Sequence, residues 1–138
     1  GVTAATAGAA LLGAPLVHDF AAVSLSDALT PWETIARRLL LAAEGDFVLC
    51  LYNPASKKRP DTLRQAAELL LRRRAPDTPC GLARRIGREG EESWLCTLGE
   101  LGEQPADMFT TVFVGNSQTQ VIGGKLVTPR GYETKGAL

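Results

Sequence analysis

The stretch FVLCLYNPASKKRP, residues 47–60, joins an apolar run to a polar, basic loop. Residues 47–51 are apolar throughout, a pattern that predicts a central strand covered on both faces of its sheet. Asn53-Pro54 favours a turn, and a helix is expected to begin near Asp61. In open α/β folds, ligands bind beside the carboxyl ends of strands. We therefore expect residues 51–53 to lie at a ligand-binding edge.

Helical and strand-like segments alternate along the rest of the chain, which predicts an α/β layer fold. The predicted class is a three-layer αβα domain with a mixed sheet of about five strands. Helices are expected over residues 2–12, 31–44, 60–74 and 98–102. Strands are expected over residues 20–25, 47–51, 80–84, 93–98 and 110–114, followed by a hairpin around Gly123-Gly124. The strands over residues 80–84 and 93–98 are expected to pair in antiparallel fashion.

Two helix ends carry clear sequence signals. Thr30 is expected to cap the helix that follows, with Pro31 at its first position and Glu33 completing a capping box. Arg72-Arg73-Arg74 closes the next helix at the negative end of its dipole. An anion site is one interpretation of this basic run, and a solvated helix end is the favoured one.

Composition bounds the class of protein. The chain has 138 residues, 45% of them apolar, and a formal net charge of zero. This length predicts a single domain with a proper core. Because there is no overall basic field, nucleic acid is not an expected partner. No apolar run approaches the length of a membrane span, so no membrane is expected either.

Cysteine and histidine usage indicates neither a disulfide framework nor a metal site. Cys50, Cys80 and Cys96 are too few and too widely spaced for either. They are expected to be small buried hydrophobes in a reducing cytoplasm. A single histidine, His18, cannot make a zinc site. A structural role for it is favoured over that of a general base.

Several short motifs follow one another in the order found in one enzyme family. They are Gly1-Val2-Thr3-Ala4-Ala5, Gly13-Ala14-Pro15-Leu16, His18-Asp19-Phe20, Ser24-Leu25-Ser26-Asp27, Leu29-Thr30-Pro31-Trp32, Leu51-Tyr52-Asn53-Pro54, Gly87-Arg88-Glu89-Gly90-Glu91, Gly115-Asn116-Ser117 and Thr128-Pro129-Arg130-Gly131-Tyr132. The ordered set covers nearly the whole chain and resembles the tetrapyrrole methylases. Within that family it is most similar to the branch that methylates C17 of precorrin-3B.

The resemblance implies an enzyme of two α/β domains with S-adenosylmethionine (SAM) bound between them. Residues 1–138 would be the C-terminal domain, with residues 1–14 as a lead-in helix, and the Gly-Asp-Pro loop of the N-terminal domain would lie outside the chain. The complete enzyme would be a cytoplasmic homodimer, and the chain alone is expected to be inactive.

The implied reaction is methyl transfer from SAM to C17 of precorrin-3B, with ring contraction to precorrin-4, in cobalamin biosynthesis. Because SAM is already an activated methyl donor, no catalytic triad or metal is required. The general base is not identified. The alternatives are a sister methylase acting at another ring carbon and a ligand-binding module without turnover.

The resemblance also implies which residues contact the cofactor. They are Thr3, Ala4, Leu51, Tyr52, Asn53, Gly87 and Asn116. The alternatives are an N-cap role for Thr3 and turn-forming roles for Asn53 and Asn116. Asn116 is expected at the same sheet edge as Tyr52. Arg84-Arg85-Ile86-Gly87 departs from the Arg-Asn-Ala-Gly run of the family, which puts a side-chain role for Arg85 in doubt.

The substrate implied by the resemblance carries many carboxylates around its rim, so it requires cationic partners. Lysine and arginine pair well with carboxylates. The candidates are Lys57, Lys58, Arg59, Arg88 and Arg130. The alternative for each is a solvated surface charge.

Overall fold

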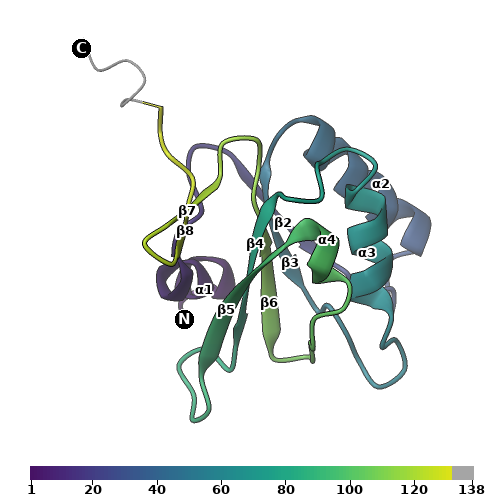
Figure 1. The fold of residues 1–138 in the computed structure, drawn as a ribbon. Helices are drawn as coiled ribbons and strands as arrows, with labels where there is room; N and C mark the ends of the chain where they lie inside the picture. The colour runs from purple at the N-terminus through teal and green to yellow at the C-terminus, as the bar shows by residue number, and fades with distance from the viewer. Residues whose placement is uncertain (132–138) are drawn as a thin grey trace.

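A five-stranded mixed sheet forms the middle layer of the computed structural model, which describes residues 1–131 (Figure 1). Its strand order is β2-β3-β6-β4-β5. The strands are β2 (Phe20–Ser24), β3 (Val48–Tyr52), β4 (Pro79–Arg84), β5 (Glu92–Thr97) and β6 (Thr110–Val114). β2 is parallel to β3, whereas β6 is antiparallel to both β3 and β4. The carboxyl ends of β2, β3 and β4 therefore meet at one edge of the sheet, next to the amino end of β6.

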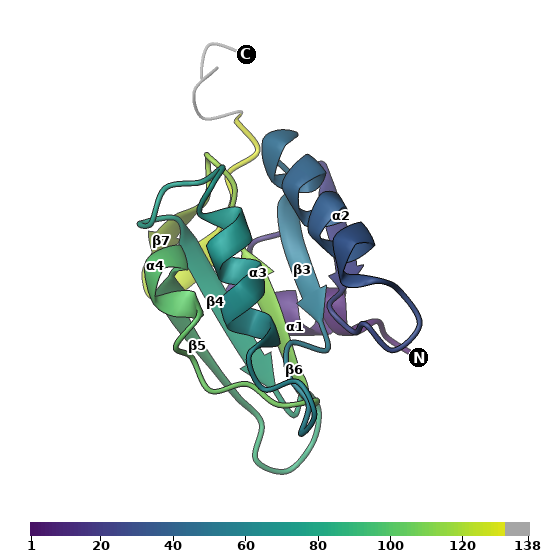
Figure 2. The same ribbon diagram turned by 90° about the vertical axis from the view of Figure 1, so that its right-hand side faces the viewer.

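Helices cover both faces of this sheet. α2 (Trp32–Glu44), α3 (Thr62–Leu70) and α4 (Leu98–Leu101) lie on one face, and α1 (Ala4–Leu12) lies on the other (Figures 1 and 2). This arrangement confirms the predicted three-layer class.

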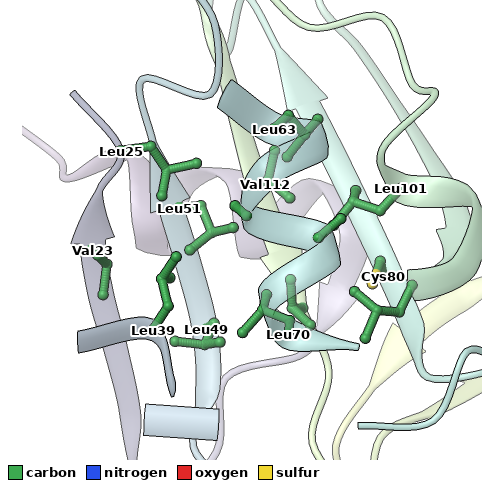
Figure 3. Close-up of a cluster of buried hydrophobic side chains, with 14 of the residues drawn as sticks. Val23, Leu25, Leu39, Leu49, Leu51, Leu63, Leu70, Cys80, Leu101 and Val112 are labelled. Atoms are coloured by element: carbon green, nitrogen blue, oxygen red, sulfur yellow. The ribbon is translucent and has the colours of Figure 1, made fainter. Parts of the chain in front are cut away.

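The larger part of the core fills the space between the sheet and α2, α3 and α4 (Figure 3). Leu39 and Leu70 from the helices and Leu49 and Val112 from the strands are completely buried there. The apolar residues of α3 recur at helical spacing and so form one buried stripe against the sheet.

Small residues allow α1 to pack closely on the other face of the sheet. A Cβ atom at Gly8 would stand 2.9 Å from a ring carbon of Phe113 on β6. A Cβ atom at Gly81 on β4 would stand 2.8 Å from Leu12. Both distances are shorter than van der Waals contact, so glycine at these two positions sets the spacing between helix and sheet.

A second, smaller sheet has the strand order β1-β8-β7. β7 (Gln120–Ile122) and β8 (Lys125–Val127) form the predicted hairpin, which turns at Gly123-Gly124. β1 (Gly13–Ala14) pairs in parallel with β8. The sequence did not predict β1, because two residues carry no strand periodicity. Tyr132 of the sequence motif at 128–132 lies outside the described residues.

The predicted capping box at Thr30 is wrong. α2 begins one residue later than expected, with Pro31 in the N-cap position and no side-chain cap. Thr30 is therefore too far from the first helical turn to serve it. A capping box occurs instead at α4, between Thr97 and Glu100. In it, the N–H of Thr97 donates to Oε1 of Glu100 over 2.9 Å.

Arg74 is not the solvated helix end that the sequence suggests. α3 ends at Leu70, and the chain then turns Arg74 into the molecule while Arg72 and Arg73 stay exposed. Nη1 of Arg74 donates to the carbonyl oxygen of Gly115 over 2.7 Å, and Nη2 donates to that of Phe47. Its Nε is buried without a hydrogen-bond partner within residues 1–131. Burial lowers the pKa of Arg74 below its ordinary value, against the opposing effect of Asp46.

None of the helices within residues 1–131 combines the length and the hydropathy needed to traverse a bilayer.

Candidate functional site

An open cleft of about 410 Å³ lies at the edge where β2, β3 and β4 end. Five segments that are distant in sequence contribute to it: the start of α1, the end of β2, the end of β3, the turn after β4, and the loop before β6 with the start of that strand. Its lining includes Ala4, Tyr52, Asn53, Ile86, Arg88 and Phe109. This position agrees with the ligand edge expected from the sequence.

The Tyr52 hydroxyl, at the end of β3, forms hydrogen bonds with the first turn of α1. It lies 3.1 Å from Oγ1 of Thr3, and it accepts a hydrogen bond from the N–H of Ala5 at 3.1 Å. Thr3 occupies the N-cap position, but its side chain makes no cap of its own. The tyrosine thus satisfies one of the N–H groups that a helix start leaves open.

The backbone adopts left-handed conformations where two strands enter the cleft. Asn53 follows β3 with φ 55°, and its Nδ2 donates to Oγ of Ser24 over 3.0 Å. Arg85 follows β4, also with φ 55°, and its N–H donates to the carbonyl oxygen of Phe109 over 3.1 Å. Asparagine tolerates this region readily, whereas arginine there is strained. Strain of this kind is concentrated at binding and catalytic sites.

Leu51 and Gly87 are neighbours of the cleft but contribute differently from Tyr52. The side chain of Leu51 is completely buried in the core on the α2 and α3 face. Only its backbone could therefore reach a ligand. Gly87 has φ 73° in the turn after β4, and its N–H donates to Oε1 of Glu91 over 2.7 Å.

Asn116 lies at the opposite end of the sheet, so its predicted position beside Tyr52 is wrong. β6 runs antiparallel to β3, which carries the end of β6 to the amino end of β3. There Nδ2 of Asn116 donates to the carbonyl oxygen of Asp46 over 3.1 Å. The neighbouring Ser117 hydroxyl donates to Oδ2 of Asp46 over 2.6 Å. These bonds join two loops and account for the polar residues after β6.

Arg130 and His18 also lie at that opposite end. The carbonyl oxygen of Arg130 is 3.2 Å from Nε2 of His18, and both residues line a hollow that also contains Asp46. The structure therefore does not bring Arg130 together with the cations of the basic loop.

The basic loop after β3 borders a second, largely apolar hollow of about 660 Å³. Lys57 and Lys58 line it and are exposed. Arg59 instead forms an ion pair of 3.2 Å with Asp27 at the surface. Arg88 approaches from the other side, with Cζ 5.3 Å from the centre of the Phe109 ring.

Sequence reasoning missed the two residues that connect these hollows, Met108 and Phe109. Both line the cleft at Tyr52 and the hollow at Lys57. The available signal was two large apolar residues placed in a loop, directly before the strand that begins at Thr110. Ser24 was also missed, because its role depends on which strand ends meet.

Reactive thiols and metal ligands do not contribute to the cleft. Cys50 and Cys80 are completely buried, as predicted, whereas Cys96 is half-buried. Burial raises the pKa of the Cys50 thiol to about 12 and that of Cys96 to about 11. Over residues 1–131, no group of three or more His, Cys, Asp or Glu side chains is arranged to hold a metal ion.

A mixed α/β domain with an open cleft at its strand ends defines a ligand-binding class of protein, and comparisons identify the family. A family model for tetrapyrrole (corrin/porphyrin) methylases matches residues 1–102. The chain therefore belongs to the tetrapyrrole methylases, in agreement with the resemblance carried by its motifs.

Relatives and a solved structure extend this assignment. A probable cobalt-factor III C(17)-methyltransferase of Salmonella typhimurium is 50% identical over 132 residues, covering 96% of this chain and 55% of the relative. A precorrin-3B C(17)-methyltransferase of Sinorhizobium sp is 50% identical over 137 residues, covering 96% and 54%. The crystal structure of the methyltransferase CobJ superimposes with a TM-score of 0.88 at 40% identity, covering 94% of this chain and 54% of that one. The chain thus spans about half the length of the curated relatives it matches.

Proposed function

We propose that this chain forms one wall of the SAM site of a C-methyltransferase acting on C17 of precorrin-3B. The product would be precorrin-4, formed with ring contraction, in cobalamin biosynthesis. The observation that carries the proposal is the convergence of Ala4, Tyr52 and Asn53 on one cleft at the strand ends, with Thr3 hydrogen-bonded to Tyr52. The names of two relatives at 50% identity support methylation of C17, one for precorrin-3B and the other for cobalt-factor III.

The residues of the cleft suit the demands of methyl transfer. Bound SAM supplies the activated methyl group, so the protein has to position the reactants and exclude water. Tyr52 is held by two contacts and so offers a fixed aromatic surface and a fixed start of α1. We assign cofactor contacts to Thr3, Ala4, Tyr52, Asn53 and the backbone of the turn at Ile86-Gly87. We do not assign one to Asn116, because it lies at the other end of the sheet.

Three cations remain as candidates for the carboxylates of the substrate: Lys57, Lys58 and Arg88. The two lysines form no ion pair within the described part of the chain, and Arg88 lies at the cleft itself. Arg59 and Arg130 are withdrawn from this role, since the first pairs with Asp27 and the second lies at the opposite edge.

Cobalt-factor III is a second candidate substrate, because four relatives at 42–50% identity carry that name, compared with one at 50% named for precorrin-3B. The test is to supply the complete protein with SAM and each substrate in turn, and to locate the added methyl group by mass spectrometry and NMR. Methylation of C17 is expected. A methyl group at another ring carbon would contradict the assignment.

We also propose that residues 1–138 are the C-terminal domain of a cytoplasmic, homodimeric enzyme with a second wall outside this chain. The coverage of about half of each relative supports the division into two domains. Calorimetry with the 138-residue chain is expected to detect weak SAM binding or none. Micromolar affinity would contradict a site shared between two domains. Light scattering on the complete protein tests the dimer.

A further inference from the structure

The loop before β6 presents two large apolar side chains to solvent at the edge of the cleft. Met108 is 67% exposed and Phe109 is 45% exposed. Together they line both the cleft at Tyr52 and the hollow bordered by Lys57 and Lys58, so the two hollows adjoin at these side chains. Ala55, Pro60 and Ala106 complete its apolar lining.

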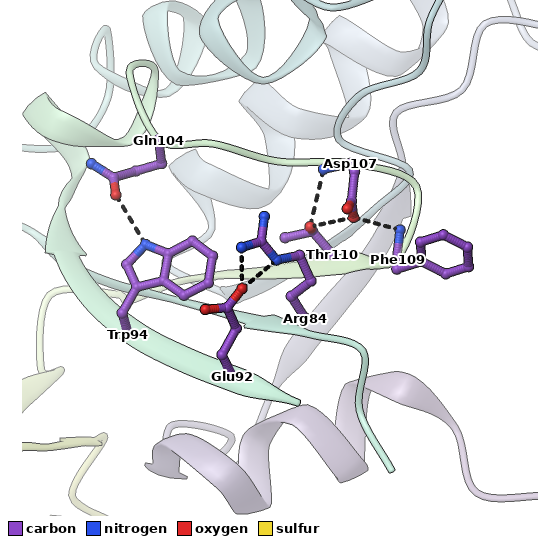
Figure 4. Close-up of polar contacts among 7 residues, drawn as sticks. All are labelled: Arg84, Glu92, Trp94, Gln104, Asp107, Phe109 and Thr110. Atoms are coloured by element: carbon purple, nitrogen blue, oxygen red, sulfur yellow. Dashed lines mark hydrogen bonds and ion pairs between the residues drawn. The ribbon is translucent and has the colours of Figure 1, made fainter. Parts of the chain in front are cut away.

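This exposure is held in place by the turn itself. Oδ1 of Asp107 accepts hydrogen bonds from the N–H of Phe109 at 2.8 Å and from the hydroxyl of Thr110 at 2.9 Å (Figure 4). The N–H of Asp107 donates in return to Oγ1 of Thr110 over 3.0 Å. A turn fixed by three such bonds cannot easily fold its apolar side chains back into the core. The rigid display of two apolar groups favours a binding surface over a frayed loop.

Positive charge borders this apolar surface on two sides. Lys57 and Lys58 lie along one side, and Arg88 lies on the other with its guanidinium 5.3 Å from the Phe109 ring centre. Arg85 is 6.0 Å from the same ring. An apolar floor with a cationic border is complementary to a large, flat, apolar molecule that carries carboxylates on its rim.

We propose that Met108 and Phe109 form the surface on which the macrocycle of the tetrapyrrole substrate lies, with Lys57, Lys58 and Arg88 pairing with its peripheral carboxylates. This inference rests on the proposed function and adds specificity-determining residues to it. Tyr52 and the cofactor cleft adjoin one side of the surface, which would bring a ring carbon to the methyl donor.

The test uses the complete protein and the double substitution Met108→Ser with Phe109→Ser. The KM for the tetrapyrrole is expected to rise about tenfold or more, because the contact buries two apolar side chains. The KM for SAM is expected to rise less than the KM for the tetrapyrrole, because Met108 and Phe109 lie only at the edge of the cofactor cleft. The melting temperature is expected to stay within about 2 °C of the wild type. Met108→Leu with Phe109→Leu should restore most of the affinity. Leu41→Ser is the matched control, since Leu41 is 56% exposed on α2.

The outcomes separate this inference from the proposed function. If the wild-type protein methylates a tetrapyrrole and the double serine variant keeps the KM of the Leu41→Ser control, the binding surface is refuted and the function stands. If the variant lowers the melting temperature or the SAM affinity but does not raise the KM for the tetrapyrrole more than the KM for SAM, Met108 and Phe109 serve folding or the cofactor cleft, and the inference also fails. If the wild-type protein neither binds nor methylates tetrapyrroles, both proposals fall.

Discussion

Replacing Arg74 with methionine tests whether this residue holds the amino end of the sheet together. Its guanidinium makes two close hydrogen bonds, to the carbonyl oxygens of Gly115 and Phe47, and two longer ones of 3.5 Å to those of Ala42 and Ala43. A hydrogen bond from a charged donor contributes roughly 1.5–3 kcal/mol, and bonds as long as 3.5 Å contribute little. The two close bonds therefore account for about 3–6 kcal/mol.

Part of that contribution would be recovered in the variant. Methionine packs its own apolar side chain, and water can reach carbonyl groups that are only half-buried. We expect the free energy of unfolding to fall by about 3 kcal/mol, which for a domain of this size lowers the melting temperature by roughly 10 °C.

Urea denaturation of Arg74→Met and of Arg73→Met would measure the difference. Arg73 is exposed and contacts only the carbonyl oxygen of Arg72, at 3.4 Å, so its replacement should cost less than about 0.5 kcal/mol. Arg74→Lys should fall between the two, because an ammonium group cannot span several carbonyls as the guanidinium does. If Arg74→Met costs no more than Arg73→Met, Arg74 is solvated and the reasoning is refuted.

Three further predictions concern the cleft, its loop and the core. Tyr52→Phe should raise the KM for SAM several-fold and destabilise the protein by about 1 kcal/mol, because it leaves the N–H of Ala5 without its hydrogen-bond partner. An unchanged KM for SAM in steady-state kinetics would argue against Tyr52 as part of the cofactor wall. Asp107→Ala should remove two hydrogen bonds from the turn that presents Phe109. The free energy of unfolding in urea should fall by about 1–2 kcal/mol, and the KM for the tetrapyrrole should rise. Glu103→Ala, at an exposed position, should change neither quantity. Burial raises the pKa of Cys50, so the folded state holds the thiol proton more tightly than the unfolded state. The free energy of unfolding should therefore decline as pH rises from about 9 toward 12, by at most about 1.4 kcal/mol per pH unit. Cys50→Ala should show a shallower decline.

The sequence was sufficient to predict elements whose signal is local. The apolar run over residues 47–51 became β3, displaced by one residue, and the run over residues 110–114 became β6 with the predicted bounds. Helix starts were less predictable. Thr30 had the right chemistry for a cap, but the position of Pro31 moved the helix start away from it.

The candidate site could be predicted only in part, because it depends on strand direction and on contacts between distant loops. Tyr52 and Asn53 follow a strand whose end faces the cleft, so the general rule for α/β folds placed them correctly. Asn116 follows a strand of similar appearance, yet it lies at the other edge, because β6 alone among the three central strands is reversed. Because β6 is reversed, its amino end lies at the cleft. Met108 and Phe109, which directly precede β6, therefore line the cleft as well.

Polar residues at the two ends of this sheet differ in what their hydrogen bonds accomplish. At the amino end of β3, the bonds of Arg74, Asn116 and Ser117 end on backbone carbonyls or on Asp46, so these polar groups are used to join neighbouring loops. At the carboxyl end of β3, Lys57 and Lys58 form no ion pair within residues 1–131, and the apolar side chains of Met108 and Phe109 remain exposed. Large apolar side chains left in water forgo the free energy of burial, and exposed apolar surface rimmed by polar residues is typical of ligand-binding sites. This exposed apolar surface with its unpaired lysines, more than the presence of polar residues, is why we propose the ligand site at the carboxyl edge of the sheet.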